Sequence, residues 1–305
     1  MYQLVILGGG PAGVSAAVYA SRKKIKSAII TPEWGGQSNV SEDIQNWIGY
    51  PHISGRELAN KFKEHVEEYA DDVLDILYPK TATKIVDLVE HFEIELSDGE
   101  KIQSKLLFIG LGSKRRKLQA KGADEFEHKG LTYCATCDGP LFAGKDVAVV
   151  GGGNSGFESA SQLLAYCNSV TLIEYADKFK ADPTTVEKLM QNPKFKAISN
   201  AEITEVYGSQ FVEGVKYKDR QNGEEKDLKA QGVFVEIGAI PNTDIVKDLL
   251  DLTEYGQIKI DPWTQKTSHD RIWAAGDCTN ILYHQNNIAS GDAVKAIEDI
   301  YGKNF

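Results

Sequence analysis

The clearest pattern along the chain is an apolar run of strand type that ends in glycines and continues into a segment of small residues. It occurs at residues 4–17, LVILGGGPAGVSAA, and again at residues 147–160, VAVVGGGNSGFESA. An apolar run without polar alternation is typical of a parallel strand that is buried on both faces. The pattern therefore predicts two strand, turn and helix units, each at the start of a parallel sheet with helices on its faces.

Both turns fit the spacing GxGxxG, through Gly8, Gly10, Gly13, Gly151, Gly153 and Gly156. Glycine suits such a turn because the turn is tight, the backbone must approach a pyrophosphate, and the helix must pack closely on its strand. The anion then rests on free N–H groups at the helix N-terminus. One GxGxxG is weak evidence, since glycine-rich turns are common. Two in matching contexts predict two dinucleotide sites, as in a flavoprotein that exchanges hydride with a nicotinamide.

A third apolar strand near the C-terminus ends in polar residues. The segment DRIWAAGDCTN, residues 270–280, ends its apolar run at Ala275-Gly276-Asp277. We expect Asp277 to accept a hydrogen bond from a ribityl hydroxyl of a flavin. An ordinary Gly-Asp turn is the alternative.

Composition and charge restrict the class of protein. At 305 residues the chain is long enough for two domains, and 42% hydrophobic with 26% charged residues is ordinary for a globular protein. A net charge of -10 argues against a nucleic-acid partner, which needs clustered Lys and Arg. No apolar run reaches membrane-spanning length, and the chain enters a strand at once without a leader pattern. We therefore expect a cytoplasmic protein with no membrane partner.

The chain has four cysteines, and two of them form the motif CATC at Cys134 and Cys137. A structural zinc site normally needs two close pairs of ligands, and no second pair is present, so we predict no metal site. A disulfide that closes so short a loop stabilises the fold little, and lasting disulfides are rare in the cytoplasm. The motif favours a dithiol that opens and closes in turnover, but the motif alone does not identify its reductant. We expect Cys167 and Cys278 to be buried packing residues.

Six motifs in order resemble those of the low-molecular-weight thioredoxin reductases, which are FAD-dependent pyridine nucleotide-disulfide oxidoreductases. They are GGGPAG, GGQSNVSEDIQNWIG (35–49), CATCDG, GGGNSG, GVFVEIGAIPNT (232–243) and AAGDC. The resemblance covers the chain from end to end. It implies an α/β fold of two doubly wound dinucleotide-binding domains and a homodimer. The NAD(P)H domain with the CxxC, residues 114–243, would be inserted into a discontinuous FAD domain, residues 1–113 and 244–305.

The resemblance also assigns residues to FAD. The implied contacts are Gly8, Gly10, Pro11, Ala12, Gly13, Gly36, Gln37, Asn46, Gly112, Gly276, Asp277, His284, Gln285 and Asn286. His284 stands where the family commonly has Arg or Lys. The segment Gly110-Leu111-Gly112 replaces the usual Ala-Thr-Gly, and we expect it to keep the backbone crossing and lose a hydroxyl.

For the nicotinamide nucleotide the implied contacts are Gly151, Gly153, Asn154, Ser155, Gly156, Glu158, Glu174, Lys180 and Gly238. NADPH-using members carry a His-Arg-Arg cluster and a further Arg four positions later. Here those places hold Glu174, Tyr175, Ala176 and Lys180. A carboxylate near this spacing after the glycine turn accepts from a ribose 2′-hydroxyl and repels a phosphate. We expect no strong cationic site for the 2′-phosphate, and we predict NADH over NADPH; a solvated Glu at a strand end is the alternative.

By the same resemblance, electrons pass from NADH to FAD and then to the Cys134–Cys137 disulfide. Cys137 would face the flavin, and Cys134 would attack the disulfide of a partner protein. Asp138 would hold the proton at the dithiol, although a helix N-cap would look the same in sequence. Because the nucleotide and the CxxC would have to reach one flavin from the same domain, we expect that domain to rotate between two states.

The segments VTLIEYADKFKAD and CDGPLFAGK are also similar to the NADH-dependent flavoprotein reductase of bacterial alkyl hydroperoxide reductase. That protein has an extra N-terminal thioredoxin-like region, and this chain begins at the FAD strand. We therefore expect a separate partner: a thioredoxin, a glutaredoxin-like carrier or a peroxiredoxin-linked disulfide protein. A ferredoxin- or oxygen-linked flavoprotein and a non-catalytic flavin redox sensor remain alternatives. The segment 57–72 predicts an amphipathic helix that either forms a dimer interface or covers its own core.

Overall fold

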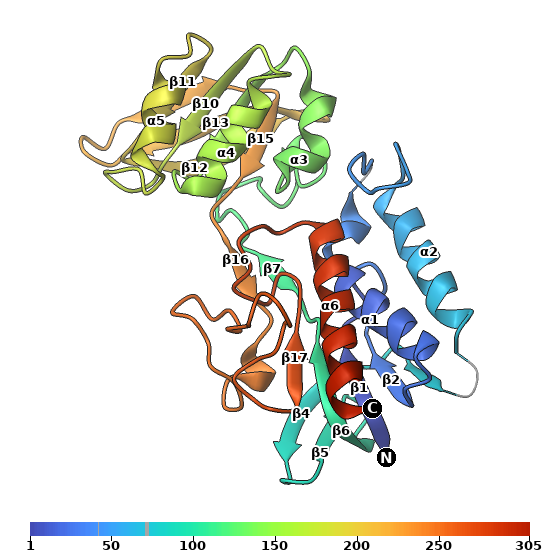
Figure 1. Cartoon of the computed structure of the whole chain (residues 1–305). Helices are drawn as coiled ribbons and strands as arrows, with labels where there is room; N and C mark the ends of the chain where they lie inside the picture. Colours follow the sequence, from blue (N-terminus) through green and yellow to red (C-terminus); the bar gives the residue numbers. More distant parts are fainter. Residues whose placement is uncertain (42, 71–72) are drawn as a thin grey trace. The chain divides into compact units, whose positions relative to one another are not determined.

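A computed structural model describes residues 1–41, 43–70 and 73–305. The chain forms two compact units (Figure 1). The first unit consists of Met1–Lys114 and Ile240–Phe305, and the second consists of Arg115–Ala239. The second unit is thus an insertion in the first, with the chain crossing after residues 114 and 239. The sequence placed these crossings after residues 113 and 243.

The first unit is built on one mixed sheet. Its elements are β1 (Tyr2–Leu7), α1 (Pro11–Arg22), β2 (Ser27–Ile30), η1 (Gly36–Val40), α2 (Gly55–Glu67), β3 (Leu74–Leu77), β4 (Ala82–Asp87), β5 (Phe92–Leu96), β6 (Lys101–Ile109), η3 (Asp244–Val246), β17 (Ile272–Ala274) and α6 (Asn286–Asn304). The strand order is β3-β2-β1-β6-β5-β4, and β17 also pairs with β6. Strands β3, β2, β1, β6 and β17 run parallel, whereas β5 and β4 are antiparallel to their neighbours.

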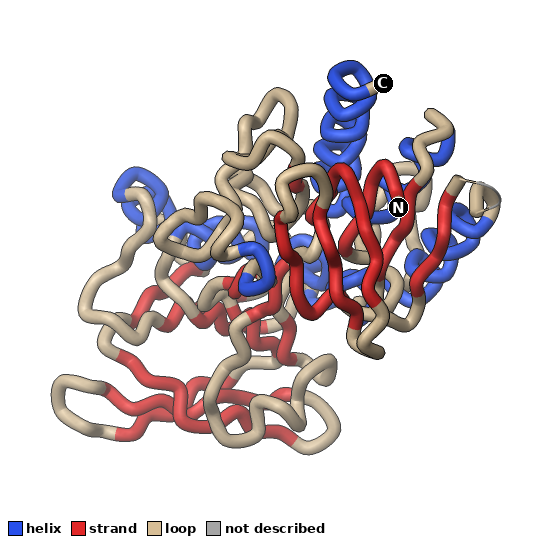
Figure 2. Tube along the Cα trace, turned by 90° about the horizontal axis from the view of Figure 1, so that it is seen from below, coloured by secondary structure: helices blue, strands red, loops and turns tan. Residues whose placement is uncertain are grey.

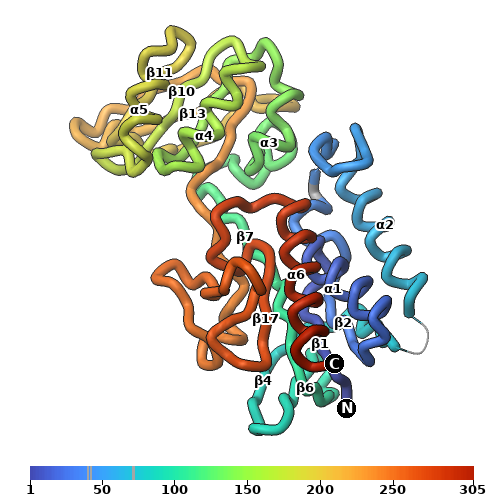
Figure 3. The backbone as a smooth tube through the Cα atoms, viewed as in Figure 1, coloured from blue at the N-terminus to red at the C-terminus, as the bar shows by residue number. Residues whose placement is uncertain are grey.

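Strand β1 is apolar throughout because the sheet is covered on both faces. Leu4 and Ile6 point into one core, which α1, α2 and α6 help to form, and Val5 and Leu7 point into the core on the other face. Helices α1 and α6 come from opposite ends of the sequence and pack against each other (Figure 3). The first and last segments of the chain therefore stabilise the same unit.

Helix α2 begins at the N-cap Ser54, whose side chain accepts from Glu57 N, and ends at Glu67. The sequence predicted this helix over residues 57–72, of which residues 71 and 72 lie outside the described residues. The apolar side of α2, with Leu58, Phe62 and Val66, is buried in the core of the first unit. Of the two interpretations of this helix, covering its own core is the one that these contacts support.

The second unit contains a parallel sheet and an antiparallel one. Its elements are β8 (Leu131–Thr132), α3 (Ala135–Asp138), η2 (Gly139–Phe142), β9 (Asp146–Val150), α4 (Asn154–Leu163), β10 (Ser169–Ile173), α5 (Pro183–Met190), β11 (Phe195–Ile198), β12 (Ala201–Gly208), β13 (Val212–Asp219), β14 (Glu225–Lys229) and β15 (Gly232–Val235). The parallel order is β11-β10-β9-β15-β8, and the antiparallel order is β12-β13-β14. Figure 2 shows the strands of both units as red tubes.

Two short strands lie at the crossings of the chain. They are β7 (Ser113–Arg115) and β16 (Ala239–Pro241), and they pair as a two-stranded sheet. Each therefore ends one unit and begins the other.

The predicted α/β class is confirmed, because both predicted strand, turn and helix segments open a parallel sheet with α-helices packed on one face. The antiparallel strands β4, β5 and β12 to β14 were not predicted from the sequence. One signal for them was present: Asn222-Gly223, a favoured hairpin turn, connects β13 with β14.

Candidate functional site

The first glycine turn joins β1 to α1. The glycines of its motif are required for different steric reasons. Gly8 has φ +111°, and a Cβ there would lie 2.3 Å from the carbonyl oxygen of Gly110. A Cβ on Gly13 would lie 1.8 Å from the oxygen of Gly8, so this glycine lets α1 pack on its strand. Gly10 differs, since the nearest atom to its Cβ position is 3.9 Å away, at Gly36. The open space over Gly10 is where a pyrophosphate fits.

The second turn, between β9 and α4, repeats this geometry closely. Gly151 has φ +121°, and its Cβ would lie 2.3 Å from the oxygen of Glu236. The Cβ of Gly156 would lie 1.9 Å from the oxygen of Gly151. Nothing lies within 4 Å of the Cβ position of Gly153. The repeat in the sequence is therefore a repeat in atomic structure, with one open position in each turn.

In both turns a helix begins directly after the glycine whose Cβ position is open. Helix α1 follows Gly10 and holds Pro11, Ala12 and Gly13 in its first turn; α4 follows Gly153 in the same way, with Asn154, Ser155 and Gly156. Neither N-cap glycine has a side chain to accept from the first amides. Those N–H groups need an acceptor from solvent or a ligand, and a phosphate is a good one.

The residues that the sequence assigned to FAD from distant motifs come together in the first unit. Gln37 Nε2 donates to Asp277 Oδ2 at 3.4 Å, and His284 Nδ1 lies 3.3 Å from Asp277 Oδ1. Two further pairs join η1 and the segment after it to the N-terminal end of α6: Ser38 with Asn286 at 3.0 Å, and Asn46 with the N-cap Gln285 at 3.1 Å. These contacts lie beside the first glycine turn, because a Cβ on Gly36 would lie 3.5 Å from Gly10 Cα and a Cβ on Gly276 would lie 3.4 Å from Ala12 Cβ.

The crossing segment after β6 is fixed by hydrogen bonds from two sides. Gly112 has φ +63°, and Asn242 closes the crossing by donating from Nδ2 to Leu111 O at 2.9 Å and from its amide to Gly112 O at 3.0 Å. Ser113, the next residue, accepts from Gln37 at 3.1 Å. The segment is thereby tied to the residues around Asp277.

Cys134 and Cys137 form a disulfide with a Cα–Cα distance of 5.3 Å. Cys134 is the N-cap of the short helix α3, and its sulfur accepts from the amide of Cys137 at 3.2 Å. Asp138 follows in the same turn, and its carboxylate accepts from the hydroxyl of Thr132 at the end of β8. The carboxyl group of the residue that follows the second cysteine is thus fixed by a residue outside the motif, Thr132.

Helix α4 supports this disulfide turn through Gln162. Its Oε1 accepts from Thr136 Oγ1 at 3.0 Å, and its Nε2 donates to Ala135 O at 3.5 Å. Both partners lie between the two cysteines, so Gln162 fixes the turn against the helix that begins at the second glycine motif. Sequence reasoning missed Gln162, because nothing in its local spacing marks it.

Glu174, directly after β10, is held at the second glycine turn. Its carboxylate accepts from the amide of Gly152 and, at 2.7 Å, from the amide of Ala176. The backbone of Lys180 donates to Gly152 O at 2.8 Å, while its side chain is exposed. The carboxylate therefore stands where an adenosine ribose meets such a turn.

A cation that the sequence did not indicate stands beside Tyr175, the residue after Glu174. Arg220 stacks on the ring of Tyr175, with its guanidinium carbon 3.8 Å from the ring centre, and donates to Tyr175 O at 3.0 Å. Arg220 follows β13, far from Tyr175 in sequence, so only the fold reveals the pair.

Glu33 was also missed, although its position follows the rule that pointed to Glu174. It stands 20 residues after Gly13, and its carbonyl oxygen would lie 2.5 Å from a Cβ on Gly9. An acid at this spacing is the expected partner of a ribose hydroxyl in the first turn.

A model of the family described as pyridine nucleotide-disulphide oxidoreductase matches residues 2–295. The chain belongs to this family. Its members' fold and enzyme class, an FAD-dependent disulfide oxidoreductase that also uses a pyridine nucleotide, are those that the motifs predicted.

Among curated relatives, the chain is 41% identical over 295 residues to a protein of Bacillus subtilis (strain 168) named NADH dehydrogenase. It is 39% identical over 299 residues to an alkyl hydroperoxide reductase subunit of Escherichia coli (strain K12). Each comparison covers 97% of this chain and 57% of the relative, so the chain spans little more than half the length of these proteins.

Solved structures of about the same length match the whole fold. The thioredoxin reductase from Streptococcus pyogenes MGAS5005 has a TM-score of 0.89 at 33% identity, covering 100% of this chain and 99% of that one. The thioredoxin reductase from Giardia duodenalis has a TM-score of 0.89 at 32% identity, covering 98% and 97%. The predicted resemblance is therefore confirmed.

The other two cysteines, Cys167 and Cys278, are buried, as predicted. Burial raises the pKa of the Cys167 thiol to about 11 and that of the Cys278 thiol to about 12. Neither forms a thiolate near neutral pH, so neither is suited to disulfide exchange.

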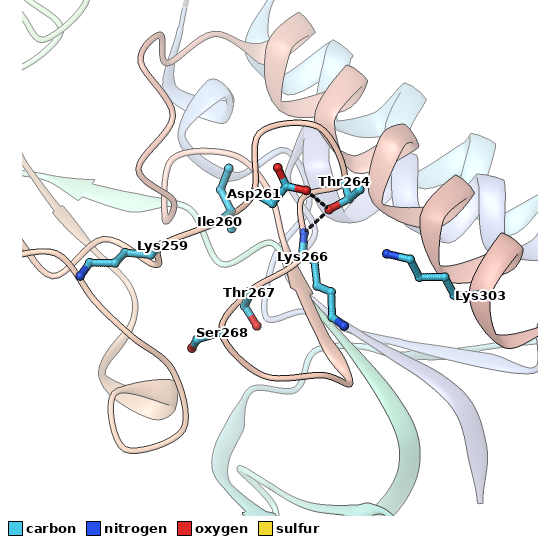
Figure 4. A pocket seen from close by; sticks show the side chains of 8 residues that line it. All are labelled: Lys259, Ile260, Asp261, Thr264, Lys266, Thr267, Ser268 and Lys303. Carbon is cyan, nitrogen blue, oxygen red and sulfur yellow. Dashed lines mark hydrogen bonds between the residues drawn. The ribbon is translucent and has the colours of Figure 1, made fainter.

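A surface pocket of about 350 Å³ lies elsewhere in the first unit (Figure 4). It is lined by Lys259, Ile260, Asp261, Thr264, Lys266, Thr267, Ser268 and Lys303. Lys303 lies near the end of α6, whereas the FAD-assigned residues lie at its start, roughly 25 Å away at 1.5 Å per residue. The pocket is therefore separate from the glycine turn.

Among the described residues, no group of three or more His, Cys, Asp or Glu side chains is placed to hold a metal ion. No helix in the described part of the chain is both long and apolar enough to span a membrane.

Proposed function

We propose that this protein passes electrons from NADH through FAD and the Cys134–Cys137 disulfide to the disulfide of a small redox protein. One observation carries the proposal: the second glycine turn and the disulfide lie at the same edge of one parallel sheet. The turn follows β9 and Cys134 follows β8, and only β15 separates these strands. At about 4.8 Å per strand, the strand ends are roughly 10 Å apart.

The first unit would hold FAD with residues that the structure gathers around Gly10. The amides at the start of α1 receive the pyrophosphate, Glu33 the adenosine ribose, and Asp277 the ribityl chain, oriented by Gln37 and His284. When bound, FAD accepts a hydride and returns two electrons to a disulfide. The remaining FAD assignments, including Asn46, Gly112 and Gln285, belong to the same proposal.

The two cysteines divide the disulfide chemistry between them. Two electrons would open the Cys134–Cys137 bond, and Cys137 would be the sulfur that faces bound FAD. The Cys134 thiolate attacks the partner's disulfide and forms a mixed disulfide, releasing one partner thiolate. Cys137 then attacks Cys134 Sγ, which restores the intramolecular bond and releases the second partner thiolate. Asp138, held by Thr132, supplies and recovers the proton at this dithiol.

The preference for NADH rests on Glu174. Its carboxylate is fixed by two backbone amides at the turn, so it accepts from a ribose hydroxyl and repels a 2′-phosphate. Arg220 is the cation within reach of the neighbouring Tyr175, and it is already engaged with that ring and carbonyl. We therefore infer that Arg220 weakens the preference without reversing it.

The partner class follows from the names of the relatives and from the chemistry of the disulfide. Thioredoxin reductases and a reductase component of the alkyl hydroperoxide system are the proteins that this chain resembles. The proposed partner is a thioredoxin, a glutaredoxin-like carrier or a peroxiredoxin-linked disulfide protein, and the proposed assembly is a cytoplasmic homodimer. Light scattering after gel filtration measures the assembly directly.

An anaerobic titration tests the electron path. NADH or NADPH is added to separate samples of the holoenzyme, and the flavin band is followed at about 450 nm. We expect rapid bleaching with NADH and an uptake of two more electrons per chain than in the variant with Cys134→Ser and Cys137→Ser. Equal uptake would remove the disulfide from the path. Bleaching by neither nucleotide would favour a ferredoxin-linked protein or a redox sensor instead.

The nucleotide preference has its own test. We expect Glu174→Ala to lower kcat/KM for NADH relative to NADPH roughly tenfold or more, because a charge-assisted hydrogen bond and a repulsion are both lost. Glu202→Ala, an exposed acid on β12, is the control and is expected to leave the ratio unchanged. If Arg220 contributes, Arg220→Ala lowers kcat/KM for NADPH alone. An unchanged ratio in Glu174→Ala would contradict the assignment.

A further inference from the structure

Four strand ends stand in a row at the carboxyl edge of the parallel sheet of the second unit. Their order is β10, β9, β15 and β8. They are followed by Glu174, the glycine turn, Glu236 and the segment that leads to Cys134. Glu236 therefore lies between the nucleotide turn and the disulfide, at a position to which the proposed mechanism gives no role.

The order of the strands gives Glu236 a place along the bound nucleotide. A dinucleotide crosses such a sheet edge at the point where the strand order reverses, with its pyrophosphate on the glycine turn. Glu174 assigns the adenosine half to the β10 side. The nicotinamide half must then extend over the other side, where β15 ends at Val235 and Glu236 begins the next segment.

The side chain of Glu236 is partly buried and well fixed. Its Oε1 accepts from Ser159 Oγ at 2.7 Å, and its amide donates to Val150 O at 2.7 Å. The charged groups that act on it are Arg115 from β7 and Glu158 from α4. Burial raises the pKa of this carboxyl and Glu158 raises it further, while the bond from Ser159 and the charge of Arg115 oppose the shift.

The backbone of the second glycine turn does not require the carboxyl group of Glu236. In the first unit the matching position is Gly110, whose carbonyl oxygen faces Gly8 as the oxygen of Glu236 faces Gly151, at 2.3 Å from the Cβ position in each case. The same backbone contact is made by a glycine in one unit and by a glutamate in the other. The glutamate side chain therefore has a role that backbone geometry does not explain.

We propose that Glu236 senses the charge of the nicotinamide ring and sets the relative affinity of the second unit for oxidised and reduced nucleotide. This inference rests on the proposed function, because it requires the second glycine turn to bind a nicotinamide nucleotide. The oxidised ring carries a positive charge and the reduced ring is neutral. An ionised carboxylate in a partly buried site favours the cation, and a protonated carboxyl loses that preference.

The charge of the bound ring determines whether nucleotide binding releases a proton from Glu236. When the oxidised nucleotide binds beside protonated Glu236, the carboxyl gives its proton to the buffer and a carboxylate and ring cation pair remains. When a nucleotide with a neutral ring binds, no proton is released. Oxidised nucleotide therefore binds more tightly as the pH rises, and the neutral form does not.

Calorimetry on the oxidised holoenzyme tests this with two probes that do not react with it. One is NAD⁺, and the other is 1,4,5,6-tetrahydro-NAD, whose ring is neutral and redox-inert. At pH 9 we expect Glu236→Gln to weaken the binding of NAD⁺ relative to the binding of the analogue, on the order of tenfold. When the unmodified protein is brought to pH 5.5, the ratio of its affinity for NAD⁺ to its affinity for the analogue should fall toward the ratio of the variant. Buffers of different ionisation enthalpy should show proton release with NAD⁺ only.

A matched control is Glu213→Gln, because Glu213 accepts from Ser209 at 2.8 Å in an exposed pair of the same unit. This control should keep the ratio and its pH dependence. An affinity ratio that is equal in Glu236→Gln and the unmodified protein at pH 9, with both probes still binding, would overturn this inference alone. If neither probe binds to the unmodified protein, the proposed function fails and this inference falls with it.

Discussion

Asp138 carries the carboxyl group nearest in sequence to the reactive sulfurs. Its two interpretations, as a proton carrier and as a structural residue of α3, lead to different expected results. As a proton carrier it would act only when the dithiol forms and exchanges. We expect Asp138→Asn to leave the rate of flavin reduction by NADH unchanged and to lower turnover with a disulfide partner about 10²- to 10⁴-fold. Stopped-flow absorbance and steady-state assays separate these two steps.

Asp146→Asn provides the control for this prediction. Asp146, at the start of β9, also accepts from a hydroxyl, that of Ser169 at 2.6 Å, but lies at the opposite end of the strand from the glycine turn. It should leave both steps intact. If Asp138→Asn lowered stability but not partner turnover, Asp138 would be a structural residue of α3 and not a proton carrier.

At the residue scale, the sequence was informative wherever the chemistry is local. Cys134, Cys137 and the glycines stand in motifs whose spacing fixes their geometry, and Glu174 follows its turn at a recognisable distance. Arg220 and Gln162 could not be predicted, because each reaches its partners through tertiary packing of another element. For such residues the sequence carries no spacing signal.

At the scale of elements, the two glycine turns allow a direct comparison of fold and binding. Gly153 faces open space, whereas a Cβ on Gly156 would lie 1.9 Å from Gly151 O. We expect Gly153→Ala to keep the fold and FAD but to weaken nucleotide binding, since the methyl group fills the space of the pyrophosphate. Gly156→Ala should instead destabilise the second unit, because α4 can no longer pack on β9.

Thermal unfolding, flavin content and calorimetry with NAD⁺ distinguish these outcomes. Gly291→Ala in α6 is the control, since nothing lies within 4 Å of its Cβ position. It should raise stability by about 0.5–1 kcal/mol, the ordinary gain of alanine in a helix. Unchanged nucleotide affinity in Gly153→Ala would show that the pyrophosphate does not lie on this turn.

A second element-scale contact joins the antiparallel strand β4 to the segment before β17. Asp87 accepts from the guanidinium of Arg271 and lies 2.9 Å from His269 Nε2. Burial raises the pKa of Asp87, but hydrogen bonds from His269, the Val89 amide and Arg271 outweigh it, so the pKa is lowered. Its contribution to stability is therefore present above the usual pKa of an aspartate and is lost as the pH falls through the lowered value.

Asp87→Asn should accordingly destabilise the first unit by about 1–3 kcal/mol at pH 7 and by less at pH 3, because below the usual pKa of an aspartate the unfolded chain takes up a proton more readily than the folded protein. Urea unfolding followed by flavin fluorescence measures the difference at both pH values. Asp98→Asn removes an exposed partner of Lys80 and should change stability little. A difference that is equal at the two pH values would contradict the assignment to this carboxylate.

The strands differ in how well the sequence predicts them. Buried parallel strands such as β1 and β9 are recognisable as continuous apolar runs before a glycine turn. The antiparallel strands β4, β12 and β14 are only partly buried, and their mixed polar and apolar residues give a weaker signal. Whether a half-buried segment forms a strand depends on the strands that pair with it, and the local sequence does not identify those strands.

At the scale of the whole molecule, two reactions depend on one unit. The nucleotide turn and the disulfide both lie in the second unit, at the ends of β9 and β8, and roughly two strand spacings separate them. The FAD-assigned residues all lie in the first unit. If the two units kept one fixed orientation, a single flavin would meet one of these groups and not the other, so we predict that the second unit alternates between two orientations.

Single-molecule energy transfer between dyes on Glu64 of α2 and Glu187 of α5 tests this alternation, since these exposed positions belong to different units. We expect two distance populations whose ratio shifts when NAD⁺ is added, because the nucleotide stabilises one orientation. Dyes on Glu187 and Glu202, both in the second unit, should give one population. A single population across units, unchanged by nucleotide during full turnover, would mean that electrons leave the flavin without rotation, and the disulfide would then need another route to it.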